Sequence, residues 1–315
     1  MTQHPRKIWA LHLGVLALLL ALNWVLPAYH HTNLARIMVL SVFAMGYNLA
    51  FGYTGLLSLG HALLFGAGIY GAGLAAQIFA WPALPAMIAG MLAGGILAAI
   101  IGALALRTAG VSFMIVTLMF AQAAYLCILY FGSVTGGDEG FVIDSQSRVL
   151  LGFDLSTEVP RYLVALLLFG VALMGNLAMV RAPFGRVMVA MRENEDRSRM
   201  LGYDPYRTKL IVMITSGVFA GTAGAAYGVM FGYVGASFAT IQYSILPMLW
   251  VLLGGAGVVL GPFIGTIVMF YLIDISSSYT TSTLSVLGVA LLFLVLFAPR
   301  GVLGAIRKRW LIWLP

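Results

Sequence analysis

Long apolar runs, interrupted by only two longer hydrophilic stretches, constrain this chain of 315 residues more than any other feature. Apolar residues make up 62% of the sequence and charged residues 9%, and the mean hydropathy is +1.01. A soluble domain carries roughly 25% charged residues. The sequence therefore predicts an all-α, polytopic membrane protein. Because a spanning helix takes about 20 residues, we expect about ten transmembrane helices in one domain, residues 1–315.

The expected spans follow the apolar runs, and their ends are set by Gly, Pro and charged residues. The first run follows Arg6 and Lys7 and has no small-x-small cleavage site after it, so we interpret it as an uncleaved span. The positive-inside rule explains the net charge of +7 without a nucleic-acid partner. It also places the N-terminus and the tail, 300–315, in the cytoplasm. The ten expected spans are 8–26, 34–51, 52–74, 83–106, 111–131, 162–180, 210–231, 245–260, 262–278 and 284–298.

The two hydrophilic stretches differ in sign and should lie on opposite sides of the membrane. Residues 133–160 contain five acidic residues and one basic residue, Arg148, which indicates an extracytoplasmic loop. Within it, Phe141 to Ile143 and Val149 to Phe153 are expected to pair as a small hairpin. Residues 181–209 hold seven of the seventeen Lys and Arg residues, which indicates a cytoplasmic loop.

The cytoplasmic loop, 181–209, reads as a compact helical element. Val187 to Leu201 is expected to form one short helix, and Gly202 stands where a left-handed cap would end it. Asp204 followed by Pro205 then starts the next helix. We expect this element to lie outside the bilayer, where it would offer a docking surface.

The charges of this loop have two interpretations. Acid-first pairs four residues apart, Glu193 with Arg197 and Glu195 with Arg199, would equally suit a solvated helix stabilised by about 0.2 to 0.5 kcal/mol per pair. An exposed apolar face beside the charges favours insertion into the groove of a partner protein instead. That face is expected to comprise Val187, Met188 and Met191.

Glycine is concentrated in two parts of the sequence. The segment Gly52 to Leu74 contains seven glycines and one histidine, His61, and predicts either a broken helix or close helix packing. In the second half, glycines recur every four residues and indicate helix contacts, at Gly217/Gly221, Gly224/Gly228 and Gly257/Gly261/Gly265.

Groups that could carry chemistry are scarce. The three lysines, Lys7, Lys209 and Lys308, lie outside glycine-rich turns and no phosphate-binding loop is present, so ATP hydrolysis is not expected on this chain. Asp274 is the only acidic residue inside an expected span, and the single cysteine, Cys127, is expected to be a buried, inert thiol. We assign no catalytic residue, no metal ligand and no cofactor.

Several motifs, taken in order, resemble those of one family across nearly the whole chain. The family is that of the LivM-like permease subunits of ATP-binding-cassette importers for branched-chain amino acids. The segments that carry the resemblance are Asn48-Leu49 with GYTGLLSLGHALLFGAGIYGAG, Leu106-Arg107 with VSFMIVTLMFAQ, TGGDEGF at 135–141, PFGRVMVAMRENEDRSRMLGYD at 183–204 and LLGGAGVVLGPFIG at 252–265.

The resemblance implies a coupling helix in the cytoplasmic loop and a solute path near the first glycine-rich segment. Arg197-Ser198 replaces two alanines that are usual in the family; this departure would suit an acidic patch on the partner, and contacts are not carried over there. The expected ATPase-docking residues are Val187, Met191, Arg192, Glu193, Asn194, Glu195, Arg199 and Gly202. The expected residues of the substrate path are Asn48, Ser58, Gly60 and His61, where a broken helix would present backbone N–H groups to a carboxylate.

The implied assembly works by alternating access in a bacterial cytoplasmic (inner) membrane. Its other members would be a second, LivH-like permease, two ATPase subunits that hydrolyse ATP and an extracytoplasmic solute-binding protein. The solute would be a branched-chain or similar amino acid, and membrane lipid would surround the chain.

Other functions remain open on the sequence alone. An importer permease for urea, short amides, aromatic amino acids or aromatic carboxylates would have a similar sequence. An ion-coupled secondary carrier would need paired charges at membrane depth, which the expected spans lack. A scaffold or enzyme subunit would leave the coupling-like loop unexplained.

Overall fold

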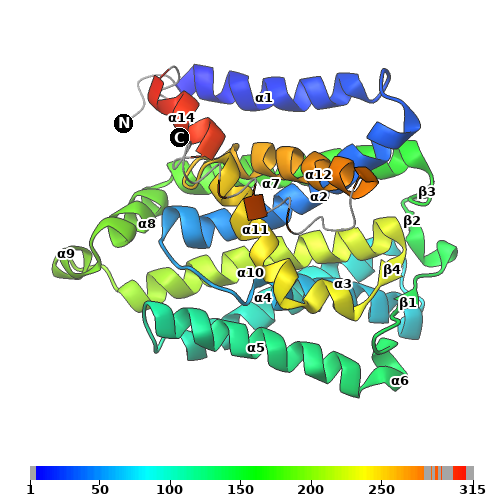
Figure 1. The fold of residues 1–315 in the computed structure, drawn as a ribbon, viewed down its shortest axis with the longest axis horizontal. Helices are drawn as coiled ribbons and strands as arrows, with labels where there is room; N and C mark the ends of the chain where they lie inside the picture. Colours follow the sequence, from blue (N-terminus) through cyan, green and yellow to red (C-terminus); the bar gives the residue numbers. More distant parts are fainter. Residues whose placement is uncertain (1–4, 280–284, 286–287, 290–291, 293–300, 310–315) are drawn as a thin grey trace.

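The computed structural model describes residues 5–279, 285, 288–289, 292 and 301–309 (Figure 1). Most of the expected span 284–298 and the last part of the expected tail, 310–315, lie outside the described residues.

Seven of the described helices are long and apolar enough to cross a membrane. The all-α, polytopic prediction is confirmed, whereas the count of ten spans stays a prediction. The 18-residue helix α1 (Pro5–Leu22) is not one of the seven. The seven are α2 (Ala28–Asn48) continued by the π-helix η1 (Leu49–Tyr53), α3 (His61–Phe79), α4 (Ala83–Ala105), α5 (Val111–Tyr130), α7 (Glu158–Arg181), α10 (Pro205–Phe231) and α12 (Gly261–Tyr279).

Close glycine contacts join α3, α4 and α10 at the centre of the molecule. A Cβ atom added at Gly221 would lie 2.9 Å from the Cα atom of Gly94, and one at Gly68 would lie 2.2 Å from the carbonyl oxygen of Gly221. A larger side chain would therefore force these helices apart. The expected helix contacts are confirmed at six of the seven positions: Gly217 and Gly221 face α4, Gly224 and Gly228 face α3, and Gly261 and Gly265 face α11. Gly257 instead lies in the turn between α11 and α12.

The expected hairpin within 133–160 is wrong in its pairing. After the short helix α6 (Gly132–Thr135), β1 (Phe141–Val142) pairs with β4 (Tyr233–Val234), while β2 (Val149–Leu150) pairs with β3 (Phe153–Asp154). The reason is the 3₁₀ turn η2 (Ser145–Arg148) that separates β1 from β2. From this turn, Arg148 donates hydrogen bonds of 2.8 and 2.6 Å to the carbonyl oxygens of Val229 and Met230. These bonds hold the loop against the end of α10, where β4 follows.

The cytoplasmic-type loop forms two helices, so the prediction of one helix over 187–201 is wrong. They are α8 (Pro183–Glu193) and α9 (Glu195–Met200). Asn194 interrupts the helix because its backbone is extended, and its side-chain oxygen accepts a hydrogen bond of 2.8 Å from the N–H of Arg197, which caps α9.

The expected boundaries after these helices are confirmed. Gly202 has a φ of +89°, in the left-handed region, and its N–H bonds the carbonyl oxygen of Arg199. The side chain of Asp204 then caps α10, which has Pro205 at its first position.

The helix after α10 is shorter than expected. Following β4 and the 3₁₀ turn η3 (Ala236–Ala239), α11 covers Ile241–Gly254 rather than 245–260. At about 1.5 Å per residue, its 14 residues fall short of a hydrocarbon core of about 30 Å. The chain turns at 255–260 into α12, and α14 (Gly301–Arg309) packs near the α11–α12 turn.

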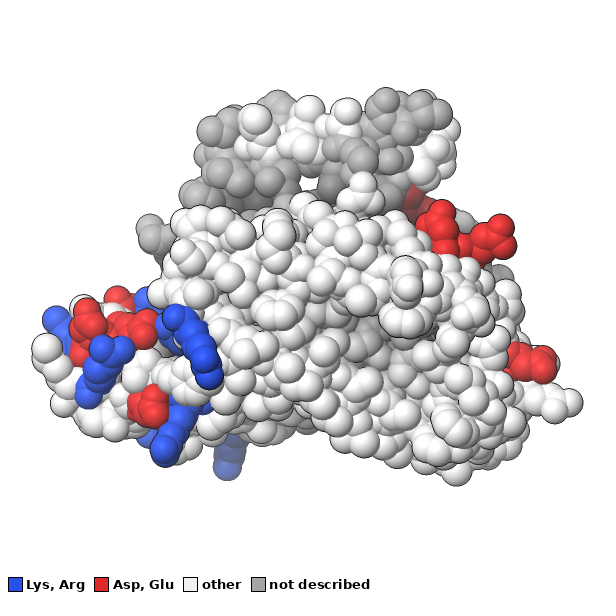
Figure 2. All heavy atoms as spheres, turned by 90° about the horizontal axis from the view of Figure 1, so that it is seen from below, with Lys and Arg blue, Asp and Glu red and all other residues white. Residues whose placement is uncertain are grey.

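The two hydrophilic loops lie at opposite ends of the bundle. Figure 1 shows α8 and α9 at one end and the four strands at the other, which we call the strand end. Trp9, near the start of α1, stacks under the guanidinium of Arg181, so α1 begins at the α8–α9 end. Figure 2 shows charged side chains at the two ends and an uncharged surface between them on the face in view. This arrangement fits a protein embedded in lipid through its middle.

Candidate functional site: a helix break joined to the α8–α9 loop

The first glycine-rich segment contains a true helix break. The helix that begins at Ala28 ends with a π-helical turn at Tyr53, and residues 54–60, which we call the break, are not helical before α3 starts at His61. Gly55 has a φ of +76°, a conformation that favours glycine. The broken helix is therefore confirmed, and so is close helix packing, since Gly68 of the same segment lies against Gly221 of α10.

Side chains from two other helices, and one from the break itself, satisfy the backbone of the break and the first turn of α3. Thr117 of α5 accepts a hydrogen bond from the N–H of Leu59 at 3.2 Å, and Ser244 of α11 accepts one from the N–H of Ala62 at 2.9 Å. Ser58 accepts a third, from the N–H of Gly60, at 3.2 Å. Irregular backbone at membrane depth is tolerated where protein satisfies it. These N–H groups are therefore already bonded in this conformation.

The residues expected to line the substrate path are buried and bonded within the chain. Asn48 donates a hydrogen bond of 3.0 Å to the carbonyl of Val258 and accepts one of 3.0 Å from the N–H of Gly257. The Nε2 atom of His61 lies 2.8 Å from the hydroxyl of Ser216 on α10. Ser58 and Gly60 lie in the break itself. The role of these four residues as lining of the path stays a prediction.

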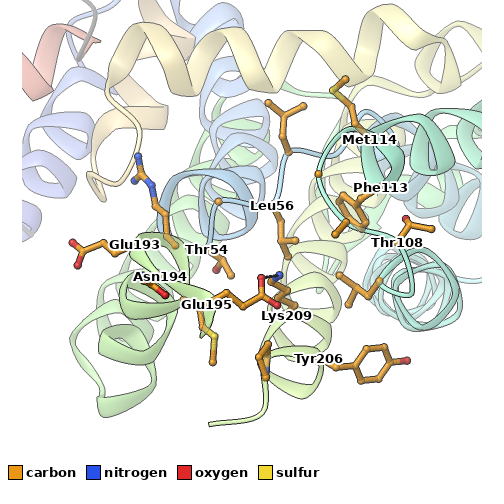
Figure 3. Close-up of a pocket in the computed structure, with 18 of the residues that line it drawn as sticks. Thr54, Leu56, Thr108, Phe113, Met114, Glu193, Asn194, Glu195, Tyr206 and Lys209 are labelled. Atoms are coloured by element: carbon orange, nitrogen blue, oxygen red, sulfur yellow. Dashed lines mark hydrogen bonds and ion pairs between the residues drawn. The ribbon is translucent and has the colours of Figure 1, made fainter. Parts of the chain in front are cut away.

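A cavity of about 740 Å³ opens where the break meets the α8–α9 loop (Figure 3). It contains six of the eight expected docking residues, and Val187 and Gly202 lie outside it. Its lining comes from the break, the α4–α5 turn, the α8–α9 loop and the start of α10: residues 54–57, 106, 108–111, 113–114, 191–195, 199, 205–206 and 209.

The prediction that Val187, Met188 and Met191 form an exposed apolar face is wrong for both methionines, and Val187 is half-buried. Met188 and Met191 are 0% and 3% exposed, because α8 packs them against the bundle. The most exposed apolar side chains of the loop lie further along, where Met200 and Leu201 are 87% and 71% exposed, compared with 39% for Val189. Figure 1 shows α9 projecting beyond the bundle, so these side chains stand at its tip.

Arg192 connects the α8–α9 loop to the helix break. Its guanidinium donates a hydrogen bond to the carbonyl oxygen of Gly52, in the last turn before the break. The same guanidinium lies against Gly257, whose N–H is held by Asn48. One side chain of α8 thus contacts both the break and the α11–α12 turn.

Glu195 forms the ion pairs of the cavity wall. Its carboxylate lies 2.5 Å from the Nζ atom of Lys209, which is only 18% exposed, and 3.9 Å from the guanidinium of Arg199 (Figure 3). The expected pair of Glu195 with Arg199 is confirmed. The expected pair of Glu193 with Arg197 does not form among the described ion pairs, because the break in the helix at Asn194 separates the two residues.

Sequence reasoning missed two arginines at the strand end. Arg36 lies inside the expected span 34–51, and its guanidinium stacks over the ring of Phe231 at 5.0 Å from the centroid. Arg161 stacks over the same ring at 5.4 Å. An arginine within an apolar run was a signal that could have revealed Arg36. Asp274, the acidic residue noted in the sequence, accepts a hydrogen bond from Tyr29 at the strand end. The prediction that Cys127 is buried is wrong, because its side chain lies on the exposed face of α5.

No metal site is formed by the described residues, since no group of three His, Cys, Asp or Glu side chains lies close enough together. The features of the site are a helix break, a projecting charged loop and an arginine that joins them. Such a site can transmit movement between the loop and the bundle.

Comparison with known proteins gives the family. Residues 31–298 match the model of the family described as branched-chain amino acid transport system / permease component. The chain is 27% identical to the high-affinity branched-chain amino acid transport system permease protein LivM of Escherichia coli K12, over 94% of this chain and 75% of that protein. It is also 27% identical to LivM of Salmonella typhimurium LT2, over 86% of this chain and 69% of that protein.

A third relative matches over a shorter length: the probable LivM of Methanocaldococcus jannaschii is 28% identical over 45% of this chain and 41% of that protein. No solved structure matches the chain. Because the family model covers more than half of the sequence and agrees with the membrane-spanning fold, this chain belongs to the family of permease components of branched-chain amino acid transport systems.

Proposed function

We propose that this chain imports branched-chain amino acids as one of two permease subunits of an ATP-driven importer, and that its α8–α9 loop docks an ATPase subunit. The permease family and the names of the curated relatives support the solute class. The observation that carries the coupling role is the hydrogen bond from Arg192 to Gly52, which joins the projecting loop to the helix break.

The proposed docking surface is the tip of the loop rather than its buried face. Met200 and Leu201 would enter a groove of the ATPase, and the charged residues around them would fix its orientation. Arg192 and Met191 would act on the other side, where they hold the loop to the bundle. Docking and transmission are thus assigned to different residues of one loop.

Movement of the ATPase would reach the membrane through two contacts of α8. Arg192 would pull on Gly52 at the end of the first half-helix, and Asn48 would pass the change to the α11–α12 turn through Gly257 and Val258. The polar side chains that hold the break, Thr117 and Ser244, would then let it shift as a unit against α5 and α11. Because packed elements switch between discrete arrangements, a small shift there can open or close a path.

The remaining parts of the assembly follow from the same proposal. A second, LivH-like permease would complete the path, two ATPase subunits would supply the energy, and a solute-binding protein would deliver the amino acid at the strand end. The α8–α9 end and both termini would face the cytoplasm of a bacterial cell, in accordance with the positive loop 181–209. This chain itself would catalyse no reaction.

Co-purification tests the proposal. The tagged chain is isolated from its native membrane, the proteins recovered with it are identified, and ATP-dependent uptake of labelled L-leucine is measured after reconstitution. We expect a second permease and ATPases with a phosphate-binding loop. The double variant Met200→Asp/Leu201→Asp should lose the ATPases and keep the second permease, because only the tip of the loop is altered.

The matched control is Leu151→Asp, which changes an equally exposed leucine, 83% exposed, at the strand end. It should retain all partners. Recovery of the chain alone, with leucine uptake that needs no ATP, would refute the importer and favour a secondary carrier.

A further inference from the structure

Two arginines and a group of aromatic rings meet at the strand end, away from the cavity of Figure 3. The guanidinium groups of Arg36 on α2 and Arg161 on α7 both lie over the ring of Phe231, the last residue of α10. Thr32 and Arg36 are half-exposed and stand one turn apart on α2, and Arg161 donates a hydrogen bond of 3.3 Å to the hydroxyl of Thr32. Arg36 on α2 and Arg161 at the start of α7 therefore lie together beside one face of α2, at the end of α10.

Neither arginine has a carboxylate partner. Among the described residues Arg36 forms no ion pair and no hydrogen bond, and the Nε atoms of both arginines are buried without an acceptor. Glu158 lies one turn before Arg161 on α7 but is not paired with it. The residues that the structure does not describe contain no Asp or Glu, so the sequence holds no further acidic candidate.

The positive charge of this region is reinforced by a third arginine. Arg148 donates hydrogen bonds to the carbonyl oxygens of Val229 and Met230, at the end of the helix that also carries Phe231. Its role is therefore structural, but it adds charge without adding an acceptor. An arginine within a spanning segment that lacks a partner in the protein indicates a functional site.

The wall beside Arg36 is aromatic and carries two free hydroxyl groups. Tyr227 packs against Phe231 and Phe238 with ring centroids 4.8 and 5.3 Å apart, and Tyr243 packs against Phe238 at 5.1 Å. Tyr227 and Tyr243 are half-buried, and their hydroxyl groups bond no other described residue. Arg36, a cation that can bind an anionic group, thus lies beside an apolar surface. The two tyrosine hydroxyl groups at the edge of this surface can form hydrogen bonds with a ligand.

We propose that Arg36, assisted by Arg161, binds the carboxylate of the solute as it enters the permease from the strand end. The apolar side chain of the solute would rest against Tyr227, Phe231 and Tyr243. The planar guanidinium suits a carboxylate because it can donate two parallel hydrogen bonds. This inference rests on the proposed function for the identity of the solute, a branched-chain amino acid, but the arginines require only that it carry a carboxylate.

The site differs from the one that the sequence predicted for the carboxylate. That prediction used backbone N–H groups around Ser58 and His61, several of which already have protein acceptors. The guanidinium of Arg36, in contrast, has no hydrogen-bond acceptor among the described residues. The two locations can be separated by experiment.

The test is direct binding of radiolabelled L-leucine to the assembled importer in nanodiscs, without the solute-binding protein. Two competitors each keep the branched apolar part: 3-methylbutanoate retains the carboxylate, and 3-methylbutylamine retains the amine. We expect 3-methylbutanoate to displace leucine and 3-methylbutylamine to fail. Arg36→Gln should weaken leucine binding by about tenfold or more, where tenfold corresponds to about 1.4 kcal/mol, and Arg36→Lys should recover part of it.

The matched control is Arg107→Gln, which removes an exposed arginine at the opposite end and should leave leucine binding unchanged. Co-purification with the partner subunits shows whether a variant has assembled. If Arg36→Gln does not assemble, Arg161→Gln and the competition on the unaltered importer still decide the matter, since neither depends on that variant.

Each outcome bears on one proposal. Leucine binding that is indifferent to Arg36 and Arg161, or displaced equally well by the amine, would overturn the arginine site, whether the arginines serve packing or hold a lipid phosphate. An importer that ignores leucine but binds another carboxylate through Arg36 would contradict the proposed solute and support the site.

Discussion

The two ends of the molecule treat their positive charges differently. At the α8–α9 end, Lys209 is paired with Glu195, and Arg192 bonds the carbonyl of Gly52. At the strand end, Arg36 and Arg161 stack on an aromatic ring and have no carboxylate partner among the described residues. Cations at the first end hold parts of the chain together. At the second end Arg148 does the same, whereas Arg36 and Arg161 remain available to an anion that the chain does not supply.

This difference separates two tasks that a transport subunit must perform. A coupling element must be fixed to the bundle, because a flexible connection would not transmit its movement to the helices. A site for a passing solute must instead keep part of its bonding capacity unused, because a charge that is already paired gives little affinity. We therefore expect that removing a paired cation at the α8–α9 end weakens coupling or stability. Removing Arg36 at the strand end should instead weaken solute binding and leave stability unchanged or increased.

Arg192→Ala should produce the largest effect. The hydrogen bond from its charged side chain is worth about 1.5 to 3 kcal/mol, so we expect ATP-driven uptake to fall by about 10- to 150-fold. Because the tip of α9 is unchanged, the ATPases should remain bound, and ATP hydrolysis should continue without transport. Uptake and ATP hydrolysis are measured together in proteoliposomes.

The control is Arg107→Ala, which removes an exposed arginine at the same end of the molecule but outside the α8–α9 loop, and should leave coupling intact. Loss of the ATPases from Arg192→Ala during purification would show that Arg192 docks the partner, as the sequence resemblance implies, rather than transmitting its motion.

Lys209→Met should have a moderate effect on stability. Its half-buried ion pair with Glu195 is worth up to about 1 kcal/mol, so the free energy of unfolding of the purified chain in detergent should decrease by about that amount. The double variant Lys209→Met/Glu195→Gln should recover part of the loss, since no carboxylate is then left without its partner.

Arg207→Met provides the comparison for this pair. Arg207 is paired with Asp204 at 3.1 Å but is largely exposed, so its loss should change stability by less than about 0.5 kcal/mol. Equal losses in the two variants would show that burial of Lys209 gives its ion pair no additional strength.

Arg36→Met should have the smallest effect on stability. The sign of the change in the free energy of unfolding shows whether Arg36 stabilises the bundle. Removing a partly buried charge that lacks a partner relieves its desolvation cost, which offsets the lost stacking on Phe231 of about 0.5 to 1 kcal/mol. We expect the free energy of unfolding to stay unchanged or to rise. A decrease above about 1 kcal/mol would show that Arg36 holds the bundle together, as Lys209 does at the other end.

Much of the fold was predictable because it depends on local pattern. The apolar runs 83–106 and 111–131 became helices Ala83–Ala105 and Val111–Tyr130 almost to the residue. Gly202 ends α9, and Asp204 with Pro205 starts α10, because caps depend on the backbone conformation of a few adjacent residues. Asn194 could also have been recognised as a cap, which would have given two helices in the loop.

The candidate site was only partly predictable. The sequence located the α8–α9 loop and the break, but Met191 was expected on the outside and lies inside. Its orientation depends on how α8 lies against the bundle, and a helical pattern in so short a loop does not reveal this. Arg36 was visible as a charge in a span, but its position over Phe231 was not.

By itself the sequence determined that the chain is a helical membrane protein, where most helices begin and end, and which loops lie at opposite ends. These properties follow from hydropathy and from caps, which act over a few neighbouring residues. Tertiary structure alone decided that β1 pairs with β4, that Arg192 reaches Gly52, and that Arg36 and Arg161 share one ring. Such contacts join residues far apart in the sequence, and only the packing of the helices brings them together.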